Sequence, residues 1–307
     1  DFARVDRELS QQKTVGEYIE FYRKLATDCR KDYGVKSYEF VLTQSMFLDY
    51  YEKSIPDWIK DTSRIMDTIT QKRKELIPIV KKLYGDTSSE YAHAVLKYGL
   101  LRSNTWNRAL SKADKSELIG LFDSALAGIN KSKALSDSII KFNTRNLMNV
   151  KANIYYKSNE ISKMKELLDS VFELSITYNL IDPSYPSALQ WYASIVLKND
   201  PPKQIEFLDA YDSIIWARFS LNPYVLFEFR KGSLSHRIAG GVLNDQTINF
   251  YRQADSLCAD LYTIKSHEYV MFMLNYRLPI LKKMGFKSAI FQTLATIENE
   301  IFDNKKL

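Results

Sequence analysis

Aromatic residues recur at seven-residue intervals in four places along the chain, each time across the boundary between two apolar segments. The four sets are Tyr33/Phe40/Phe47, Tyr84/Tyr91/Tyr98, Tyr178/Tyr185/Tyr192 and Tyr262/Tyr269/Tyr276. Four residues after the first Tyr of each set stands a residue type that commonly caps a helix N-terminus, because its side-chain oxygen accepts a hydrogen bond from a free backbone N–H. These residues are Ser37, Ser88, Asp182 and Ser266. The pattern predicts a repeated unit of helix, tight turn and capped helix.

The spacing of these units predicts six helix pairs. The first Tyr residues are 51, 94 and 84 positions apart, and halving the two longer intervals places one degenerate unit near residue 131 and another near residue 220. The predicted pairs are 13–33 with 36–54, 57–84 with 88–106, 114–131 with 135–158, 160–180 with 183–199, 201–221 with 223–238, and 244–262 with 266–284, followed by a last helix near 286–303. A two-helix unit cannot bury its apolar face alone and must stack on its neighbours. We therefore expect an all-α, right-handed superhelical α-α solenoid with a C-terminal capping helix, forming one domain over residues 1–307.

Local signals support several of these boundaries. Pro201 and Pro223 stand where a helix can begin, because the first turn of a helix needs no N–H from them. Asp114 with Glu117 three residues later predicts a capping box, and Gly240-Gly241 predicts the clearest break between helices.

Composition agrees with a folded helical protein. Hydrophobic residues make up 45% of the chain, and only 10 Gly and 8 Pro are available for the many turns of a β-sandwich. The net charge of +6 mildly favours acidic partners but is too small to indicate nucleic-acid binding by itself. No stretch reaches the ~18 apolar residues of a membrane span, so we expect a soluble protein. Asp1 at the start of the sequence is compatible with a removed leader and export, although the compartment stays open.

The two cysteines occupy equivalent positions in distant repeats. Cys29 and Cys258 each precede the first Tyr of their unit by four residues, where the other two copies have Val80 and Leu174. They therefore replace apolar residues on the inner face of a first helix. Since a solenoid keeps distant repeats apart, we predict two free, buried thiols and no disulfide.

One junction has a family likeness. The segment Leu83-Tyr84-Gly85-Asp86-Thr87-Ser88-Ser89-Glu90-Tyr91-Ala92 resembles the junction of tetratricopeptide repeats of the long kinesin-light-chain type. Gly85 and Ala92 match that pattern, Ser88-Ser89 replaces its usual His-Pro, and the turn at Asp182-Pro183 restores a Pro. The resemblance implies a helical-repeat scaffold that holds a partner peptide in a concave groove.

Residues for catalysis or metal binding are few. His93, His236 and His267 have no second His or Cys at metal-ligand spacing, and no nucleotide-binding or hydrolase motif is present. The pair Asp209/Asp212 is interpreted as part of a solvated helix face rather than as a catalytic pair. We therefore expect no catalytic residue, no metal and no cofactor.

The recurring aromatic residues favour a packing seam over a platform for stacking nucleic-acid bases. The better binding candidates lie ten and eleven residues before each first Tyr, where three of the four repeats carry a basic residue. They are Tyr22, Arg23, Arg73, Lys74, Tyr251 and Arg252, with Leu167 and Leu168 in the remaining copy. The family resemblance implies that this part of the first helix faces the groove, where cations beside aromatic rings suit an acidic peptide. The alternative is that these cations only solvate helix faces.

The sequence thus favours a non-catalytic scaffold that binds a protein or peptide, with an acidic one suiting the charge. Two alternatives remain open. The first is that the chain is the ligand-sensing region of a regulatory or cell-surface assembly. The second is that it is a nucleic-acid-binding helical-repeat protein, and the modest net charge disfavours this second alternative. The oligomeric state is not specified by these patterns.

Overall fold

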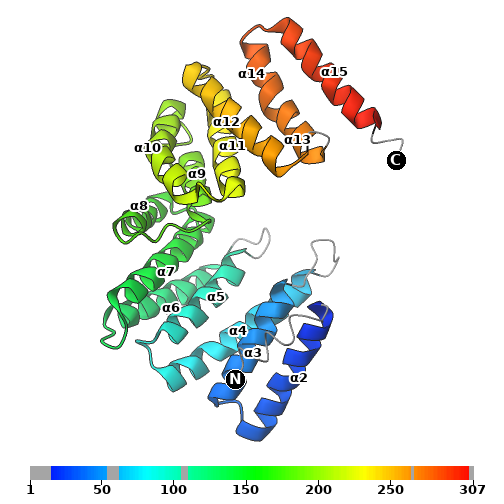
Figure 1. The fold of residues 1–307 in the computed structure, drawn as a ribbon. Helices are drawn as coiled ribbons and strands as arrows, with labels where there is room; N and C mark the ends of the chain where they lie inside the picture. The colour runs from blue at the N-terminus through cyan, green and yellow to red at the C-terminus, as the bar shows by residue number, and fades with distance from the viewer. Residues whose placement is uncertain (1–14, 54–61, 105–109, 264–265, 304–307) are drawn as a thin grey trace. The chain divides into compact units, whose positions relative to one another are not determined.

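The computed structural model describes residues 15–53, 62–104, 110–263 and 266–303, and all regular structure within these ranges is helical (Figure 1). In chain order the helices are α2 (Val15–Tyr33), α3 (Tyr38–Lys53), α4 (Thr62–Tyr84), α5 (Ser89–Asn104), α6 (Lys112–Asn130), α7 (Asp137–Lys157), α8 (Ile161–Thr177), α9 (Tyr185–Val196), α10 (Pro201–Phe219), α11 (Pro223–Ala239), α12 (Asp245–Leu261), α13 (His267–Phe272), the π-helical turn η1 (Met273–Arg277), α14 (Leu278–Lys283) and α15 (Lys287–Asp303). The predicted all-α fold is confirmed. The predicted boundaries at 13, 54, 57 and 106 lie outside the described residues.

The helices cluster into two compact units, which we call unit 1 (Asp1–Leu180) and unit 2 (Ile181–Leu307). In unit 1, α3 packs on α2 and α4, α5 packs on α4, α6 and α7, and α8 packs on α7. In unit 2, α11 packs on α9, α10 and α12, and α14 packs on α15. Packing between successive helices is the arrangement of an α-solenoid. The two helices of the fourth predicted pair, α8 and α9, belong to different units.

Three of the four predicted caps begin their helices as expected. The hydroxyls of Ser37, Ser88 and Ser266 each accept a hydrogen bond of 3.1 Å from the backbone N–H three residues later. The fourth predicted cap, Asp182, differs. Its carboxylate accepts a hydrogen bond of 2.8 Å from the Ser184 N–H and so forms a turn that precedes α9. The Pro at position 183 has no N–H, and α9 begins only at Tyr185.

The predicted capping box at Asp114 is wrong by one turn. Ser111 is the N-cap of α6, and its hydroxyl accepts from the Asp114 N–H at 3.1 Å and donates to the Asp114 carboxylate at 2.7 Å. The predicted starts at Pro201 and Pro223 are confirmed, because Asp200 and Asn222 cap these helices through bonds to Lys203 N–H and Val225 N–H.

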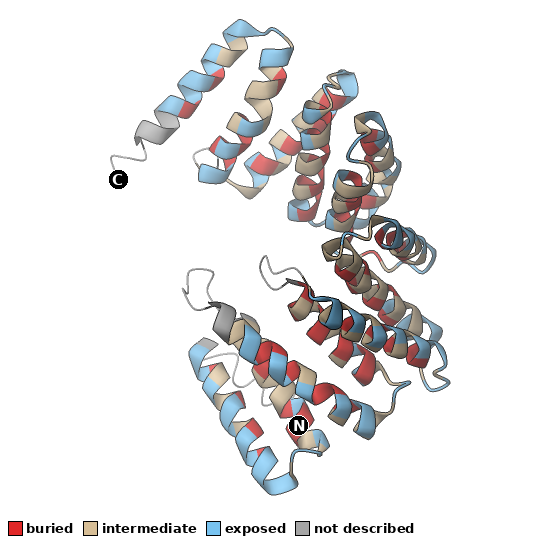
Figure 2. Cartoon of the chain, turned by 180° about the vertical axis from the view of Figure 1, so that it is seen from behind, coloured by how far each residue is buried: buried red, intermediate tan, exposed pale blue. Residues whose placement is uncertain are grey.

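The aromatic repeat marks the packing seam mainly inside the second helices, although Tyr84 and Tyr262 also pack against the cores. Its second members are all buried, namely Phe40, Tyr91, Tyr185 and Tyr269. Its first members at the ends of α2 and α8 differ, because Tyr33 is 63% exposed and Tyr178 is 38% exposed. Figure 2 places the buried residues on the helix sides that face neighbouring helices. The prediction that these aromatic residues form core is confirmed for the second members and wrong for Tyr33 and Tyr178, which lie where their helices end.

Both cysteines are free and buried, as predicted. Cys29 belongs to the core of unit 1, and Cys258 belongs to the core of unit 2. Burial and the nearby Asp255 carboxylate raise the pKa of Cys258 to about 12, so its thiol stays protonated and unreactive at neutral pH.

The helix predicted for residues 266–284 is interrupted by the π-helical turn η1. Pro279 lies two residues after the end of this turn, and its nitrogen has no hydrogen to donate to the carbonyl of Asn275 four residues earlier. Widening of the helix before the proline accommodates this lost bond. The last helix, α15, lies where the capping helix was predicted, and its Ile297 joins the core of unit 2.

Close backbone contacts fix the packing of unit 1. Gly128 of α6 is buried against the turn between α4 and α5, and a Cβ atom at this position would lie 1.9 Å from the Asp86 carbonyl oxygen. A side chain therefore cannot fit without moving the turn that carries the Ser88 cap.

Gly128→Ala is expected to lower the free energy of unfolding by about 3 kcal/mol, because backbone must shift to admit the methyl group. Gly120→Ala on the same helix is the control, since a Cβ there meets nothing within 4 Å and the substitution should stabilise the helix by about 0.5–1 kcal/mol. Urea unfolding followed by circular dichroism measures both. Equal effects of the two variants would contradict this packing.

Candidate binding groove

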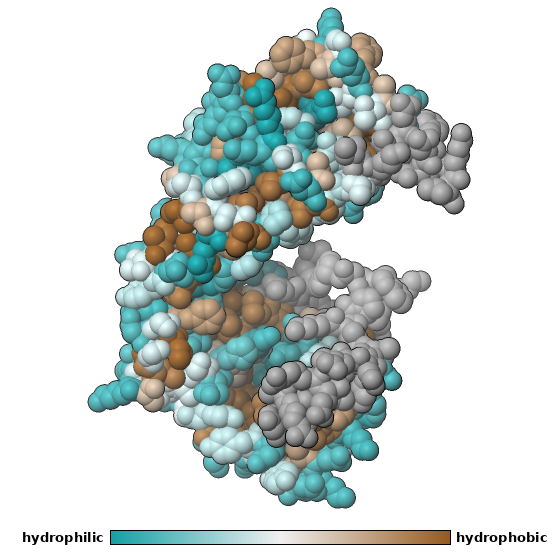
Figure 3. Space-filling model, in the orientation of Figure 1, coloured by the Kyte–Doolittle hydropathy of each residue, from teal (hydrophilic) through white to brown (hydrophobic). Residues whose placement is uncertain are grey.

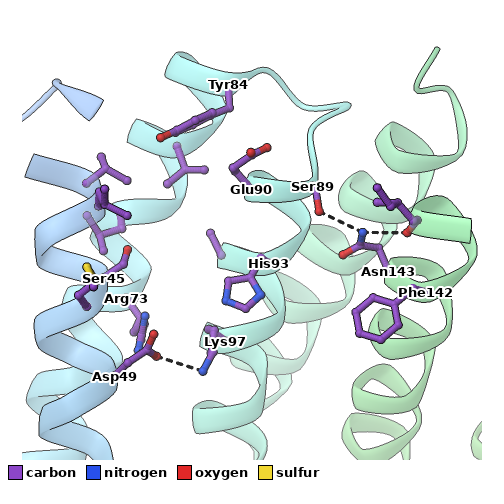
Figure 4. A pocket seen from close by; sticks show the side chains of 17 residues that line it. Ser45, Asp49, Arg73, Tyr84, Ser89, Glu90, His93, Lys97, Phe142 and Asn143 are labelled. Atoms are coloured by element: carbon purple, nitrogen blue, oxygen red, sulfur yellow. Dashed lines mark hydrogen bonds and ion pairs between the residues drawn. The ribbon is translucent and has the colours of Figure 1, made fainter. Parts of the chain in front are cut away.

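A hollow with a mixed apolar and polar lining lies in unit 1 and has a volume of about 620 Å³. It lies between α3, α5 and α7, which are the second helices of three successive predicted pairs, and α4 contributes further residues to its lining. We call it the unit-1 groove. Figure 4 shows its two ends, with Tyr84 and Glu90 at one and Asp49 and Lys97 at the other.

The end near the helix turns is mainly apolar, with Glu90 as its charged residue. It is lined by Val41 and Leu42 from the start of α3 and by Val80 and Tyr84 from the end of α4. The Tyr84 ring contacts the edge of Tyr38, whose hydroxyl donates to the Leu83 carbonyl at 3.2 Å. Burial, followed by the nearby Glu90 carboxylate, raises the pKa of Tyr84, which therefore remains a neutral hydrogen-bonding group.

The opposite end holds three paired charges. Asp49 of α3 accepts hydrogen bonds from Arg73 of α4 at 2.6 Å and from Lys97 of α5 at 3.0 Å. Glu52 lies 3.6 Å from the same guanidinium, whose side chain is only 5% exposed. Burial alone raises the pKa of Asp49, but the charges of Arg73 and Lys97 outweigh that effect and lower it. Asp49 is therefore ionised and links three helices.

His93 on α5 lies between the two ends of the groove (Figure 4). Partial burial and the positive charge of Lys97 lower its pKa, so the imidazole is neutral at pH 7. A neutral imidazole has one donor and one acceptor nitrogen. The side chain therefore offers a ligand both kinds of hydrogen bond without adding charge.

The third wall comes from α7. Its buried Asn143 donates a hydrogen bond of 3.1 Å to the Ser89 hydroxyl, which joins α7 to the start of α5. The same amide donates a second hydrogen bond of 2.9 Å to the Ile139 carbonyl within α7. Beside it, Ile139 and Phe142 are 41% and 47% exposed, and Leu42 on the facing wall is 44% exposed. The rim of the groove therefore presents apolar surface to the solvent.

The residues predicted for binding are not gathered at one site. Tyr22 is 1% exposed and stacks on Tyr50, with ring centroids 5.0 Å apart, so its ring has no surface for a partner. Arg23 is exposed and paired with Glu20, and Lys74 is paired with Glu117 at 2.7 Å. Of the six, Arg73 alone lines the unit-1 groove, and it does so as a buried structural cation.

The remaining two predicted residues, Tyr251 and Arg252, line a separate hollow of about 360 Å³ in unit 2. The predicted binding residues lie on the first helices, whereas the unit-1 groove is built mainly from second helices. The sequence feature that could indicate this groove is the short side chains of Ser45 and Ala94, which leave space between the facing sides of α3 and α5.

The interpretation of Asp209 and Asp212 as a solvated face is wrong. Asp209 pairs with Arg237 and Asp212 pairs with Arg230, and both of these arginine side chains are almost fully buried. The two guanidinium groups lie 4.4 Å and 4.1 Å from the ring centre of Phe250. The two carboxylates are thus the counter-ions of a cation–aromatic cluster in the core of unit 2.

His236 has a structural role in the same unit. Its ring nitrogens lie 2.9 Å from the Gln204 side-chain oxygen and 3.3 Å from the Ser194 hydroxyl, and burial lowers its pKa. Among the described residues, no group of three His, Cys, Asp or Glu side chains is arranged to hold a metal ion. No helix in the described ranges is both long and apolar enough to cross a bilayer.

Comparison of the sequence with profiles of known protein families and with curated proteins found no significant match. The groove must therefore be interpreted from its own chemistry.

Asp49→Asn is expected to lower the free energy of unfolding at pH 7 by about 3 kcal/mol, because it leaves the buried Arg73 with only the more distant Glu52. The pKa of Asp49 in the folded protein is below its ordinary value of 3.8, so its contribution is present above that pH and is lost as the pH falls through the lowered value. Urea unfolding at several pH values measures the difference between wild type and variant. A difference that stays constant down to about pH 2 would contradict this assignment.

Proposed function

We propose that the unit-1 groove binds an apolar segment of a protein partner and that the chain is a non-catalytic helical-repeat scaffold. The observation that carries this proposal is the combination of a hollow of about 620 Å³ with an exposed apolar rim of Leu42, Ile139 and Phe142. Ligand sites span about 300–1,000 Å³ and combine apolar walls with a few convergent polar groups. The volume and the lining of the groove both fall in this class.

The charged end of the groove favours a ligand that carries an acidic residue next to its apolar part. Lys97 shares its partner Asp49 with Arg73, and its side chain is 28% exposed. A ligand carboxylate can therefore approach Lys97 while Asp49 stays bound to Arg73. His93 and Ser45 add neutral hydrogen-bonding groups between this cation and the apolar end.

The polar groups of the groove support binding rather than catalysis. Among the described residues, no Ser or Cys side chain forms a hydrogen bond with His93, so the nucleophile and base of acyl transfer are not paired here. The walls are helices joined by the Asp49 ion pairs and the Asn143 hydrogen bonds. A preformed surface of this kind reduces the ordering cost of binding.

The tetratricopeptide-like junction at Tyr84–Ala92 supports the same class of function, because repeats of that family are peptide-binding scaffolds. On the face of the molecule shown in Figure 3, small apolar areas are interspersed with hydrophilic residues. An apolar rim next to paired charges is therefore a local feature that suits a short segment of a partner.

The test selects peptides that bind the full chain from a random display library. We expect the selected peptides to combine large apolar residues with Asp or Glu. Ser45→Trp, which fills the groove, and Phe142→Ala, which removes part of its rim, should each weaken their binding by about tenfold or more, equivalent to ~1.4 kcal/mol.

Lys72→Trp is the matched control, because Lys72 is an exposed residue of α4 outside the groove lining. It should leave binding unchanged. Thermal unfolding of each variant establishes that the fold is retained. Peptides that bind Ser45→Trp and Phe142→Ala as tightly as the wild type would refute a binding role for this groove.

A further inference from the structure

The hollow in unit 2 that contains Tyr251 and Arg252 has a different chemistry from the unit-1 groove. Its volume is about 360 Å³, and it lies between α12 and the segment formed by η1 and α14. On α12, Ile248, Arg252 and Asp255 recur at helical spacing and so share one face. From the other side, η1 contributes Arg277 and α14 contributes Ile280.

Two arginines in this hollow have no carboxylate partner. Within the described ranges, neither Arg252 nor Arg277 takes part in an ion pair, whereas the other arginines that line a hollow or a core in unit 2 are paired with Asp209 or Asp212. Arg252 is exposed and Arg277 is half-buried. Two guanidinium groups at one hollow supply planar, charged donors that match a carboxylate.

The acidic residue of the hollow does not neutralise both arginines. Asp255 accepts a hydrogen bond of 3.1 Å from the Tyr269 hydroxyl, which directs one of its oxygens toward α13. Two positive charges and one negative charge leave a net charge of +1 in the lining. The charge complementary to this lining is that of a single anion.

Tyr251 adds a neutral donor to the same hollow. Burial and the adjacent Asp255 carboxylate raise the pKa of Tyr251 far above its ordinary value, so the hydroxyl keeps its proton. Its oxygen is buried, and no group among the described residues meets hydrogen-bond geometry with it. The adjacent Asp255 carboxylate interacts with this hydroxyl without a well-aligned hydrogen bond, and an acceptor on a ligand would supply one.

The rest of the lining is aliphatic and aromatic. Ile280, Leu281 and Met284 of the α14 segment lie beside Phe286, which is half exposed. These residues suit the hydrocarbon part of a small ligand. The π-helical turn, which ends at Arg277, places this arginine next to them, and such turns are frequent at functional sites.

We infer that the hollow of unit 2 is a second binding site, separate from the proposed groove function, and that it takes a carboxylate attached to an aliphatic body. Arg252, Arg277 and the Tyr251 hydroxyl bind the carboxylate, and the apolar wall covers the chain. Both a free aliphatic acid and the C-terminal carboxylate of a peptide ending in an aliphatic residue have this chemistry.

The test titrates octanoate into the full chain by isothermal titration calorimetry, with octylamine as the probe of opposite charge. We expect saturable binding of octanoate and none of octylamine. Arg252→Gln and Arg277→Gln should each weaken octanoate binding by about tenfold, because each removes a charge-assisted hydrogen bond. Arg252 is exposed, so its variant separates loss of binding from loss of folding.

Lys282→Gln is the matched control, since Lys282 is an exposed cation of α14 outside the hollow. It should leave octanoate binding unchanged. Once octanoate binding is established, a peptide ending in Leu, compared with its C-terminal amide, distinguishes the two sources of carboxylate. Preferential binding of the acid form assigns the site to peptide ends as well, and binding of octanoate without the peptide assigns it to free acids. Octanoate that binds no better than octylamine, or an Arg277→Gln effect no larger than that of Lys282→Gln, would overturn the assignment.

Discussion

The buried guanidinium of Arg73 is the constraint on which the unit-1 groove depends. A charge that is only 5% exposed requires a carboxylate close by, and Asp49 supplies it from the neighbouring helix. Because Asp49 also accepts from Lys97, one carboxylate joins α3, α4 and α5 at the same level. The two facing helices α3 and α5 are thus bridged by charges at one end, while short side chains such as Ser45 and Ala94 leave the space between them open.

The core of unit 2 also contains buried arginines that are paired with carboxylates. The guanidinium groups of Arg230 and Arg237 both lie close to the Phe250 ring, and Asp212 and Asp209 provide the counter-charges from α10. In contrast, Arg252 and Arg277 have no such partner among the described residues. The arginines paired with Asp49, Asp209 and Asp212 hold helices together, whereas Arg252 and Arg277 line the hollow where we infer a ligand.

The fold could be predicted from the sequence because its signals are local. A serine cap, a proline in a first turn or a Gly pair acts on its own helix, and Ser37, Pro201 and Gly241 function where they were expected. The exceptions lie beside prolines, since Pro183 precedes the late start of α9 and Pro279 lies just after the π-helical turn.

The candidate site could be predicted much less well, because ion pairs across helices have no signature in the order of residues. Asp49 and Lys97 are 48 positions apart, and nothing near either residue indicates that they meet. The same limit explains why Asp209 and Asp212 were interpreted as solvated and why Tyr22 was placed on a binding surface. The sequence pattern correctly marked Tyr251 and Arg252 as neighbours on one helix, but only the fold brings Arg277 to them.

The most direct test of the proposed groove is a methyl NMR titration of the full chain with a peptide selected for binding. Met46 lines the unit-1 groove, and Met271 is an exposed methionine of unit 2 that provides an internal reference. If the groove is the binding surface, the methyl signal of Met46 will shift with the peptide concentration and that of Met271 will not. A shift of Met271 with no change at Met46 would contradict the account.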